Sequence, residues 1–279
     1  MKLSKKIIAV ALSACMTAVC FAGCGGSSST PASNTSATEE SKTSVKTMHE
    51  GVLTIGMEVG YPPFEQFADD GTTPTGYDVD LAKEVCDKLG LECDFINTAF
   101  DGIIQGIGTN YDCVFSALTI TDERKETCLF STPYIDNYQS IVIVKGSTQK
   151  FESLNDLDGK DIALQKEATS DVLLDNLIGK GTISCKKVAQ EKVTTCFTQL
   201  TNGEVDAVLC DSTVADGYVS SSPDLYEIAF QDKTSPEQFG VAMSKNDTEL
   251  QKAINDALDE LKADGTLDDI YKKWFGSAQ

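Results

Sequence analysis

Apolar runs and amphipathic stretches alternate along residues 52–115, which predicts strands that alternate with helices. The clearest helix is marked by Leu81, Val85 and Leu89, which recur every four residues and are followed by Gly90, a residue type that commonly ends helices. The elements expected here are strands at 52–56, 91–95 and 113–115 and helices across 81–89 and 100–107. This βαβαβ order predicts a mostly parallel sheet covered by helices, with ligands bound beyond the carboxyl ends of the strands.

The same alternation begins again after Tyr134. The expected elements are strands at 140–145, 162–165 and 205–210, separated by polar helical stretches at 170–177 and 193–202. The chain closes with two amphipathic helices, whose apolar stripes are Leu250, Ile254, Leu258 and Leu261, and then Leu267, Ile270, Trp274 and Phe275. We therefore predict two α/β lobes.

The N-terminus has the pattern of an export signal. Three lysines precede the apolar run Ile7–Ala22, which is too short to span a bilayer comfortably. Small residues directly before Cys24 resemble a bacterial lipobox, with Phe21 where leucine is usual. We expect residues 1–23 to be a lipoprotein signal peptide and Cys24 to carry the lipid. The alternative is an ordinary signal peptide cut near Ala22, with Cys24 incidental.

The region after Cys24 contains hardly any large apolar side chain as far as Lys46, so it cannot fold by itself. We expect residues 24–50 to be a flexible, lipid-anchored tether. No later segment reaches the ~18 uninterrupted apolar residues of a transmembrane helix. The formal net charge of −20 excludes an ordinary nucleic-acid binder. We therefore expect an extracytoplasmic globular body that the lipid holds at the cell membrane.

The stretch Cys113–Arg124 has the pattern of a strand that ends in a small anion site. Ser116, Ala117 and Thr119 follow the strand with hydroxyls and little bulk, so backbone amides there could bind a ligand. Arg124 falls in the first turn of the next helix, where a cation opposes the helix dipole. Either neighbouring acids neutralise it, or its guanidinium reaches toward an anion. The first alternative is a surface ion pair, which contributes only ~0 to 1 kcal/mol.

Several classes of catalytic and metal site are excluded by composition. His49 is the only histidine, which excludes a Ser-His-Asp or Cys-His catalytic site and a histidine-based metal centre. No CxxC pair occurs, which argues against zinc, and the glycine-rich stretch 102–108 lacks the GxGxxG spacing of a nucleotide loop. We therefore expect a binding protein with no catalytic residue, metal or cofactor.

A series of motifs carries a close family resemblance. In chain order they are Leu53–Gly56, Tyr61–Glu65, Gly76–Ala82, Phe100–Ile103, Leu118–Lys125, Phe130–Tyr134, Leu261–Thr266 and Tyr271–Gly276. Together they resemble solute-binding protein family 3, the polar amino-acid-binding proteins of ABC importers, over roughly residues 50–276.

The resemblance implies a periplasmic-binding-protein-like fold of type II. In this fold two Rossmann-like α/β lobes are joined by two crossing strands, here near Asn137–Val142 and Phe239–Met243. Lobe 1 would contain residues 51–140 and 241–279, and lobe 2 would contain residues 141–240.

The resemblance also implies a binding site for both charged groups of an amino acid. Arg124 and the Thr119 hydroxyl would bind the α-carboxylate, helped by the backbone N–H groups of Ala117 and Thr169. The family usually has glycine followed by serine or threonine before Thr169, whereas this chain has Glu167 and alanine. The departure removes one hydroxyl and adds an acid beside the carboxylate site.

The remaining contacts implied by the family concern the ammonium and the side chain of the ligand. Asp211 and Ser116 would receive the α-ammonium, Tyr61 and Phe100 would enclose the aliphatic part, and Glu58 would meet the side-chain tip. Taken singly, each aromatic residue is more typical of a core and Asp211 of a helix cap. Together they predict a site that binds a zwitterion.

The charge of this site predicts the ligand class. Glu58 and Glu167 would be acids in excess of those that the zwitterion needs, so a cationic side chain such as that of arginine, lysine or ornithine is favoured. If Glu58 stays hydrated, glutamine or cystine fits as well. The expected partners are this free amino acid and an ABC permease. The alternatives are a cyclic-acid dehydratase on the same fold, with Glu58 or Glu167 as proton donor or base, and a ligand sensor for a membrane receptor.

Seven cysteines follow Cys24, an odd number for an exported protein, so at least one stays free. Cys86 and Cys93 flank Gly90, and a bridge between them is geometrically plausible; family members with basic ligands often carry a pair at this spacing. We expect the other five to be buried as small apolar side chains: Cys113, Cys128, Cys185, Cys196 and Cys210.

Overall fold

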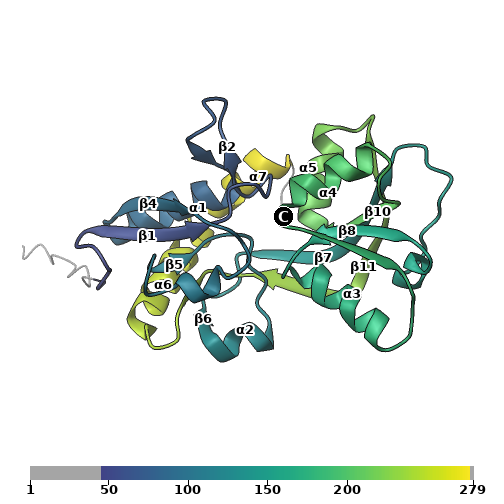
Figure 1. Cartoon of the computed structure of the whole chain (residues 1–279). Helices are drawn as coiled ribbons and strands as arrows, with labels where there is room; N and C mark the ends of the chain where they lie inside the picture. Colours follow the sequence, from purple (N-terminus) through teal and green to yellow (C-terminus); the bar gives the residue numbers. More distant parts are fainter. Residues whose placement is uncertain (1–44, 277–279) are drawn as a thin grey trace, which may run out of the picture. The chain divides into compact units, whose positions relative to one another are not determined.

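The computed structural model describes residues 45–276, which form two α/β lobes (Figure 1). The expected signal peptide, Cys24 and the tether as far as residue 44 lie outside the described residues. In the described part of the chain, no helix is long and apolar enough to cross a membrane.

The first lobe is built on a sheet with the strand order β4-β1-β5-β12-β6. Its strands are β1 (Val52–Met57), β4 (Glu92–Asn97), β5 (Cys113–Val114), β6 (Cys128–Phe130) and β12 (Ala242–Ser244). β1 pairs in parallel with β4 and β5, as the alternation predicts, whereas β12 pairs antiparallel with β5 and β6. A small hairpin, β2 (Gln66–Phe67) and β3 (Pro74–Thr75), follows β1.

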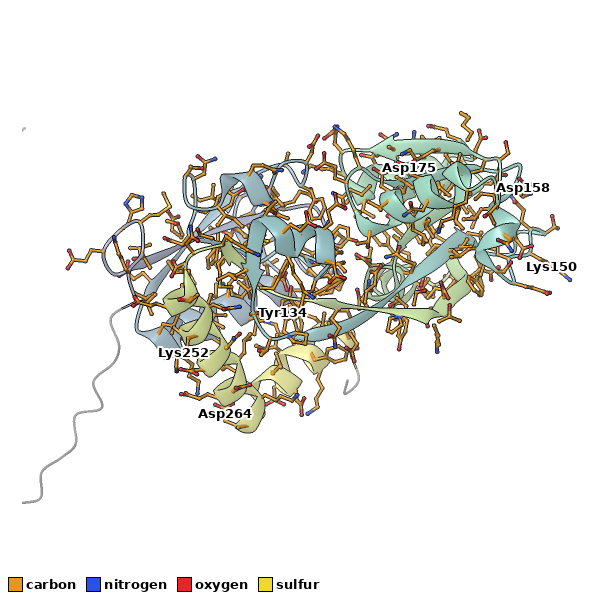
Figure 2. All side chains as sticks on the ribbon, turned by 90° about the horizontal axis from the view of Figure 1, so that it is seen from below. Tyr134, Lys150, Asp158, Asp175, Lys252 and Asp264 are labelled. Carbon is orange, nitrogen blue, oxygen red and sulfur yellow. A yellow bond between two sulfur atoms is a disulfide. The ribbon has the colours of Figure 1, made fainter. Side chains whose placement is uncertain are left out.

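The helices of the first lobe follow the predicted apolar stripes. They are α1 (Tyr77–Leu89), α2 (Asp122–Thr127), α6 (Thr248–Ala263) and α7 (Thr266–Phe275). α1 buries Leu81 and Val85 and ends at Gly90, which has the left-handed φ of 70°. α6 and α7 pack against α1, so the last part of the described chain completes the first lobe. Lys252 and Asp264 mark α6 and its end in Figure 2.

The second lobe has a sheet with the order β11-β7-β10-β8-β9. Its elements are β7 (Ile135–Val144), η2 (Leu154–Leu157), β8 (Asp161–Gln165), α3 (Thr169–Gly179), β9 (Lys186–Gln190), α4 (Val193–Thr201), β10 (Ala207–Asp211), α5 (Ser212–Ser221) and β11 (Tyr226–Phe239). β8 pairs in parallel with β9 and β10. Asp158 and Asp175 mark this lobe in Figure 2.

Two long strands carry the chain between the lobes. β7 leaves the first lobe just after Tyr134, and β11 returns to it, pairing antiparallel with β7 from Tyr226 opposite Val144 to Phe239 opposite Ile135. The return crossing precedes the expected Phe239–Met243, because Ala242 and Met243 already pair with β5 and β6 of the first sheet.

The prediction of a helix across 100–107 is wrong in its length. Only a single 3₁₀ turn forms, η1 (Ile104–Gly106). A β-carbon at Gly106 would lie 2.1 Å from the Tyr111 hydroxyl oxygen, and that hydroxyl donates to the Ile103 carbonyl at 2.5 Å. Glycine weakens a helix, and the missing side chain of Gly106 also leaves room for the Tyr111 ring, which packs against the turn.

The cysteines of the described residues divide as the family resemblance implies. Cys86 at the end of α1 and Cys93 in β4 form a disulfide with Cα atoms 6.1 Å apart, which confirms the predicted pair. The other five form no bridge within residues 45–276: Cys113, Cys128, Cys196 and Cys210 are buried as expected, whereas Cys185 is only partly buried, in contrast to the expectation.

Candidate ligand-binding site

Arg124 connects the two lobes. It lies in the first turn of α2, where the Thr121 hydroxyl caps the helix by accepting a hydrogen bond from the Arg124 N–H at 3.1 Å. Its Nη1 donates to the Thr119 carbonyl at 2.9 Å, and its Nη2 donates to the Glu167 carbonyl of the other lobe at 3.1 Å. The guanidinium carbon lies 5.7 Å from the centre of the Phe100 ring. This environment differs from the surface ion pair of the alternative interpretation.

The strand end at Ser116 and Ala117 is bonded within the first lobe. The Ser116 hydroxyl donates to Glu65 Oε1 at 2.8 Å and accepts from the Glu58 N–H at 3.0 Å. Ala117 has a left-handed φ of 44°, and its N–H donates to Asp78 Oδ2 at 2.6 Å. The Ala117 N–H is therefore not free for the ligand carboxylate, because the buried carboxyl of Asp78 needs a hydrogen bond. The Ser116 hydroxyl, which was expected to receive the ammonium, is already bonded to Glu65 and to the Glu58 backbone.

Asp211 ends β10 and is buried between the lobes. Its Oδ1 accepts hydrogen bonds from Asn137 Nδ2 at 2.7 Å and Gln139 Nε2 at 2.8 Å, both from β7. Its Oδ2 accepts a short hydrogen bond from the Tyr61 hydroxyl of the first lobe. Burial raises the pKa of Asp211, while these three hydrogen bonds act to lower it. Tyr61 thus bonds to Asp211, the residue predicted to bind the ammonium of the ligand. The sequence had indicated Tyr61 only as a neighbour of the aliphatic part of the ligand.

Glu237 is a site residue that the sequence reasoning missed. Its Oε2 accepts hydrogen bonds from the same two amides, Asn137 Nδ2 at 2.9 Å and Gln139 Nε2 at 3.0 Å, and from the Thr169 hydroxyl at 3.2 Å. Burial and the charge of Asp211 raise the pKa of Glu237 to about 7. The only sequence signal is that Glu237 alternates with Phe239, near the expected second crossing.

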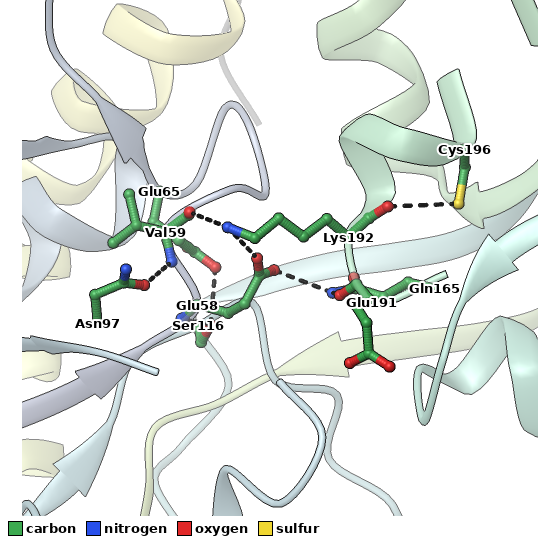
Figure 3. Close-up of polar contacts among 9 residues, drawn as sticks. All are labelled: Glu58, Val59, Glu65, Asn97, Ser116, Gln165, Glu191, Lys192 and Cys196. Atoms are coloured by element: carbon green, nitrogen blue, oxygen red, sulfur yellow. Dashed lines mark hydrogen bonds and ion pairs between the residues drawn. The ribbon is translucent and has the colours of Figure 1, made fainter. Parts of the chain in front are cut away.

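Glu58 follows β1 and lies in a polar cluster that crosses between the lobes (Figure 3). Its Oε2 accepts a hydrogen bond from Gln165 Nε2 at 3.0 Å, and its Oε1 lies 3.6 Å from Lys192 Nζ. The Lys192 ammonium also donates to the Val59 carbonyl at 3.1 Å. Burial raises the pKa of Glu58, and Gln165 and Lys192 act to lower it. Because Glu58 is only 1% exposed, it is not the hydrated carboxylate of the neutral-ligand alternative.

Glu167 lies at the Arg124 end of the cleft. Its side chain is exposed and accepts a weak hydrogen bond from the Gly102 N–H at 3.4 Å, next to an ion pair of Lys166 with Asp101. Its φ of 61° is left-handed, a conformation that glycine adopts without strain. The family's usual glycine at this position therefore has a backbone reason, while the role of the Glu167 carboxylate as a surplus acid stays a prediction.

A hollow of about 650 Å³ lies at the Arg124 end of the cleft. Its lining includes Phe100, Arg124, Thr169 and Glu237. Thr169 is the first residue of α3, so its N–H lies at the positive end of a helix dipole, where anions are favoured. Among residues 45–276, no group of three or more His, Cys, Asp or Glu side chains is arranged to hold a metal ion.

Comparisons with known proteins identify the family of this chain. Residues 53–277 match the model of the bacterial extracellular solute-binding proteins, family 3. The chain is 33% identical over 228 residues to the ABC transporter arginine-binding protein 1 of Escherichia coli K12, covering 80% of this chain and 90% of that protein. It is 32% identical over 234 residues to the L-cystine-binding protein TcyJ of the same strain, covering 83% and 85%. A solved structure of an ancestral arginine-binding protein bound to arginine matches with a TM-score of 0.75 at 38% identity, covering 81% of this chain and 99% of that one. The chain therefore belongs to the bacterial extracellular solute-binding proteins of family 3.

Proposed function

We propose that this protein is a lipid-anchored amino-acid-binding protein that holds a free amino acid between its lobes and delivers it to an ABC permease. The observation that carries the proposal is that the Arg124 guanidinium lies close enough to the carboxyls of Asp211 and Glu237 for their charges to act on it, and that Arg124 and Glu237 line the same hollow. Such a set is complementary to a zwitterion. The proposal includes the boundaries given above, with lobe 1 at 51–140 and 241–279 and lobe 2 at 141–240.

The carboxylate of the ligand would bind at the hollow. Arg124 has two terminal nitrogens that now donate to backbone carbonyls, and these can turn to two carboxylate oxygens. Thr169 lines the same hollow from the other lobe, and the Thr119 carbonyl lies beside the guanidinium. Each charge-assisted hydrogen bond of this kind contributes roughly 1.5 to 3 kcal/mol.

The ammonium would bind between Asp211 and Glu237, which share the amide donors of Asn137 and Gln139. An ammonium has three donors, so it can satisfy both carboxylates. Ser116 would act by positioning, since its hydroxyl holds the Glu58 backbone.

The side chain of the ligand would extend between Tyr61 and Phe100 toward Glu58. Glu58 Oε1 is buried, accepts no hydrogen bond from residues 45–276 and has only the 3.6 Å ion pair with Lys192, so a ligand that brings N–H donors to it is favoured. We therefore favour arginine, lysine or ornithine over glutamine or cystine, and all of these over glutamate. The compared relatives named for arginine and cystine are consistent with that order.

A ligand panel tests the proposal. We expect arginine, lysine or ornithine to raise the unfolding temperature of the purified protein most, with a calorimetric affinity in the micromolar range or tighter, which corresponds to about −8 kcal/mol. Glutamine and cystine should follow, and glutamate should have no effect. Stabilisation by glutamate without any by arginine or lysine would reject the charge argument, and no response to any amino acid would reject the function.

A cyclic-acid dehydratase is the second candidate, because Glu237 has the raised pKa, about 7, of a proton donor. A binding protein is favoured because Asp211 matches an ammonium that such substrates lack. Release of an unsaturated product from a hydroxylated cyclic acid, followed by absorbance, would establish the enzyme.

The lipid anchor is tested separately. Cys24→Ser should release the protein from the membrane, because the lipid would be the only attachment. Membrane retention of this variant would contradict the anchor. Co-purification of the wild type with a receptor in place of a permease would favour the ligand sensor.

A further inference from the structure

The Lys192 side chain reaches from one lobe into the other. It starts at the residue that precedes α4, and its ammonium ends beside Glu58 and the Val59 carbonyl of the first lobe (Figure 3). The Lys192 side chain is 46% exposed, whereas that of Glu58 is only 2% exposed. A half-exposed cation of the second lobe therefore lies beside a buried carboxylate of the first lobe.

The contact between Lys192 and Glu58 is incomplete. The Nζ to Oε1 distance of 3.6 Å is longer than a hydrogen bond, and the buried Glu58 Oε1 has no hydrogen-bond partner within the part of the chain that the structure describes. Gly60 leaves the necessary space, since a β-carbon there would lie 2.7 Å from Glu58 Oε1 and 3.1 Å from Lys192 Nζ. The pair is thus accommodated by the backbone but leaves Glu58 able to accept a better donor.

We propose that Lys192 is a built-in competitor of the ligand's side-chain cation: a basic amino acid reaches Glu58 only by displacing the Lys192 ammonium, whereas a neutral ligand leaves the ion pair in place. This inference rests on the proposed amino-acid-binding function. It makes Lys192 a specificity-determining residue, although it carries the same charge as the favoured ligand.

The chemistry of the two cations supports the exchange. A guanidinium presents five N–H donors in a rigid fork, so it can satisfy Glu58 Oε1 and still leave donors for neighbouring acceptors. A lysine ammonium on a flexible, half-exposed stem can move into water without leaving a buried charge behind. Displacement therefore replaces the weak contact of Glu58 with Lys192 by a stronger contact of Glu58 with the ligand. Because the Lys192 contact is lost in the exchange, the net affinity for the basic ligand is lower than it would be without Lys192.

The Lys192 contacts also hold the lobes together. Two of its partners, Glu58 and the Val59 carbonyl, belong to the first lobe, and Gln165 of the second lobe binds the same carboxylate. Loss of the Lys192 ammonium should therefore shift the ligand-free protein toward a more open arrangement.

Lys192→Met tests both consequences, because methionine keeps an apolar stem of similar length and removes the charge. Lys186→Met is the matched control, since Lys186 pairs with Asp161 within the second lobe. Calorimetry with arginine and with glutamine measures affinity, and small-angle scattering of the ligand-free proteins measures opening.

We expect Lys192→Met to bind arginine roughly three- to tenfold more tightly, with glutamine unchanged or weaker, as suits the loss of one partly exposed ion pair. Its ligand-free radius of gyration should increase, and Lys186→Met should match the wild type in both measurements. Weaker arginine binding by Lys192→Met would overturn the proposal, as would an equal gain for arginine and glutamine. If no amino acid binds even the wild type, the proposed function fails, while an unchanged radius in Lys192→Met would by itself refute the interlobe contact.

Discussion

The two ends of the cleft differ in the groups that form them. At the Arg124 end, the guanidinium donates to two backbone carbonyls, and a helix begins at Thr169 beside an open hollow. At the Glu58 end, side chains from both lobes already pair with one another, through Gln165 and Lys192. The difference suggests a division of labour. Groups held by the backbone would bind the part that all amino acids share, and exchangeable side chains would distinguish one amino acid from another.

The largest expected loss of affinity comes from a substitution at the Arg124 end of the cleft. Arg124→Ala should weaken binding of arginine and glutamine alike by at least ~3 kcal/mol, because the variant removes a bidentate partner of the carboxylate. Arg124→Lys should recover only part of the loss, since an ammonium cannot reproduce the fork. Calorimetry measures both variants, and thermal unfolding checks that they remain folded. Unchanged binding by Arg124→Ala would show that Arg124 does not bind the ligand, as in the alternative interpretation of a surface ion pair.

The next effect is confined to the other end. Glu58→Gln keeps the shape of the side chain and removes its charge, so arginine binding should weaken by roughly 2 kcal/mol while glutamine binding changes little. The ratio of the two calorimetric affinities is the measurement. An equal loss for both ligands would show that Glu58 supports the cleft without reading the ligand's side chain.

Glu237 should make the stability of the folded protein depend on pH. Its pKa of about 7 lies above the ordinary 4.5, so the folded protein holds this proton more tightly than the unfolded chain does. The resulting stability is fully present below pH 4.5 and is lost as the pH rises through 7. Between pH 5 and 8 the wild type should lose about 1 to 2 kcal/mol more than Glu237→Gln, as measured by urea unfolding. Parallel pH profiles would exclude this role.

The same carboxyl should release a proton when the ammonium of the ligand binds beside it, because a cation favours the charged form. Calorimetry near pH 6.5 in buffers of different ionisation enthalpy detects the proton, and Glu237→Gln should abolish its release. Binding enthalpy that is independent of the buffer in the wild type would place the ammonium elsewhere.

The smallest effect concerns the backbone at the Arg124 end. Glu167→Gly keeps the carbonyl that accepts from Arg124 and relieves a left-handed φ of 61°, so stability should rise by roughly 0.5 kcal/mol with binding nearly unchanged. Urea unfolding and calorimetry measure the two quantities. A loss of arginine binding would show that the Glu167 side chain belongs to the carboxylate site.

The predictions from sequence succeeded where local pattern decides structure. The stripe of Leu81 and Val85 gives α1, and Thr121 caps α2 so that Arg124 sits in its first turn. The prediction failed at 100–107, where local apolar spacing indicated a helix but the packing of Gly106 against Tyr111 allows only one 3₁₀ turn. Ala117 shows the same limit, since its N–H is taken by Asp78 from another element.

The sequence by itself determined the two α/β lobes and indicated the disulfide pair and the residues proposed for the zwitterion site, because hydrophobic periodicity, capping and an ordered series of motifs are all local properties of the chain. Only the tertiary structure decided which of those side chains are already bonded to one another. Lys192 meets Val59 across 133 residues of sequence, and Gln165 meets Glu58 across 107. Glu237 joins Asp211 because β11 and β10 both flank β7 and so bring their side chains to the same two amides. Such contacts depend on how distant segments pack, which no local pattern specifies.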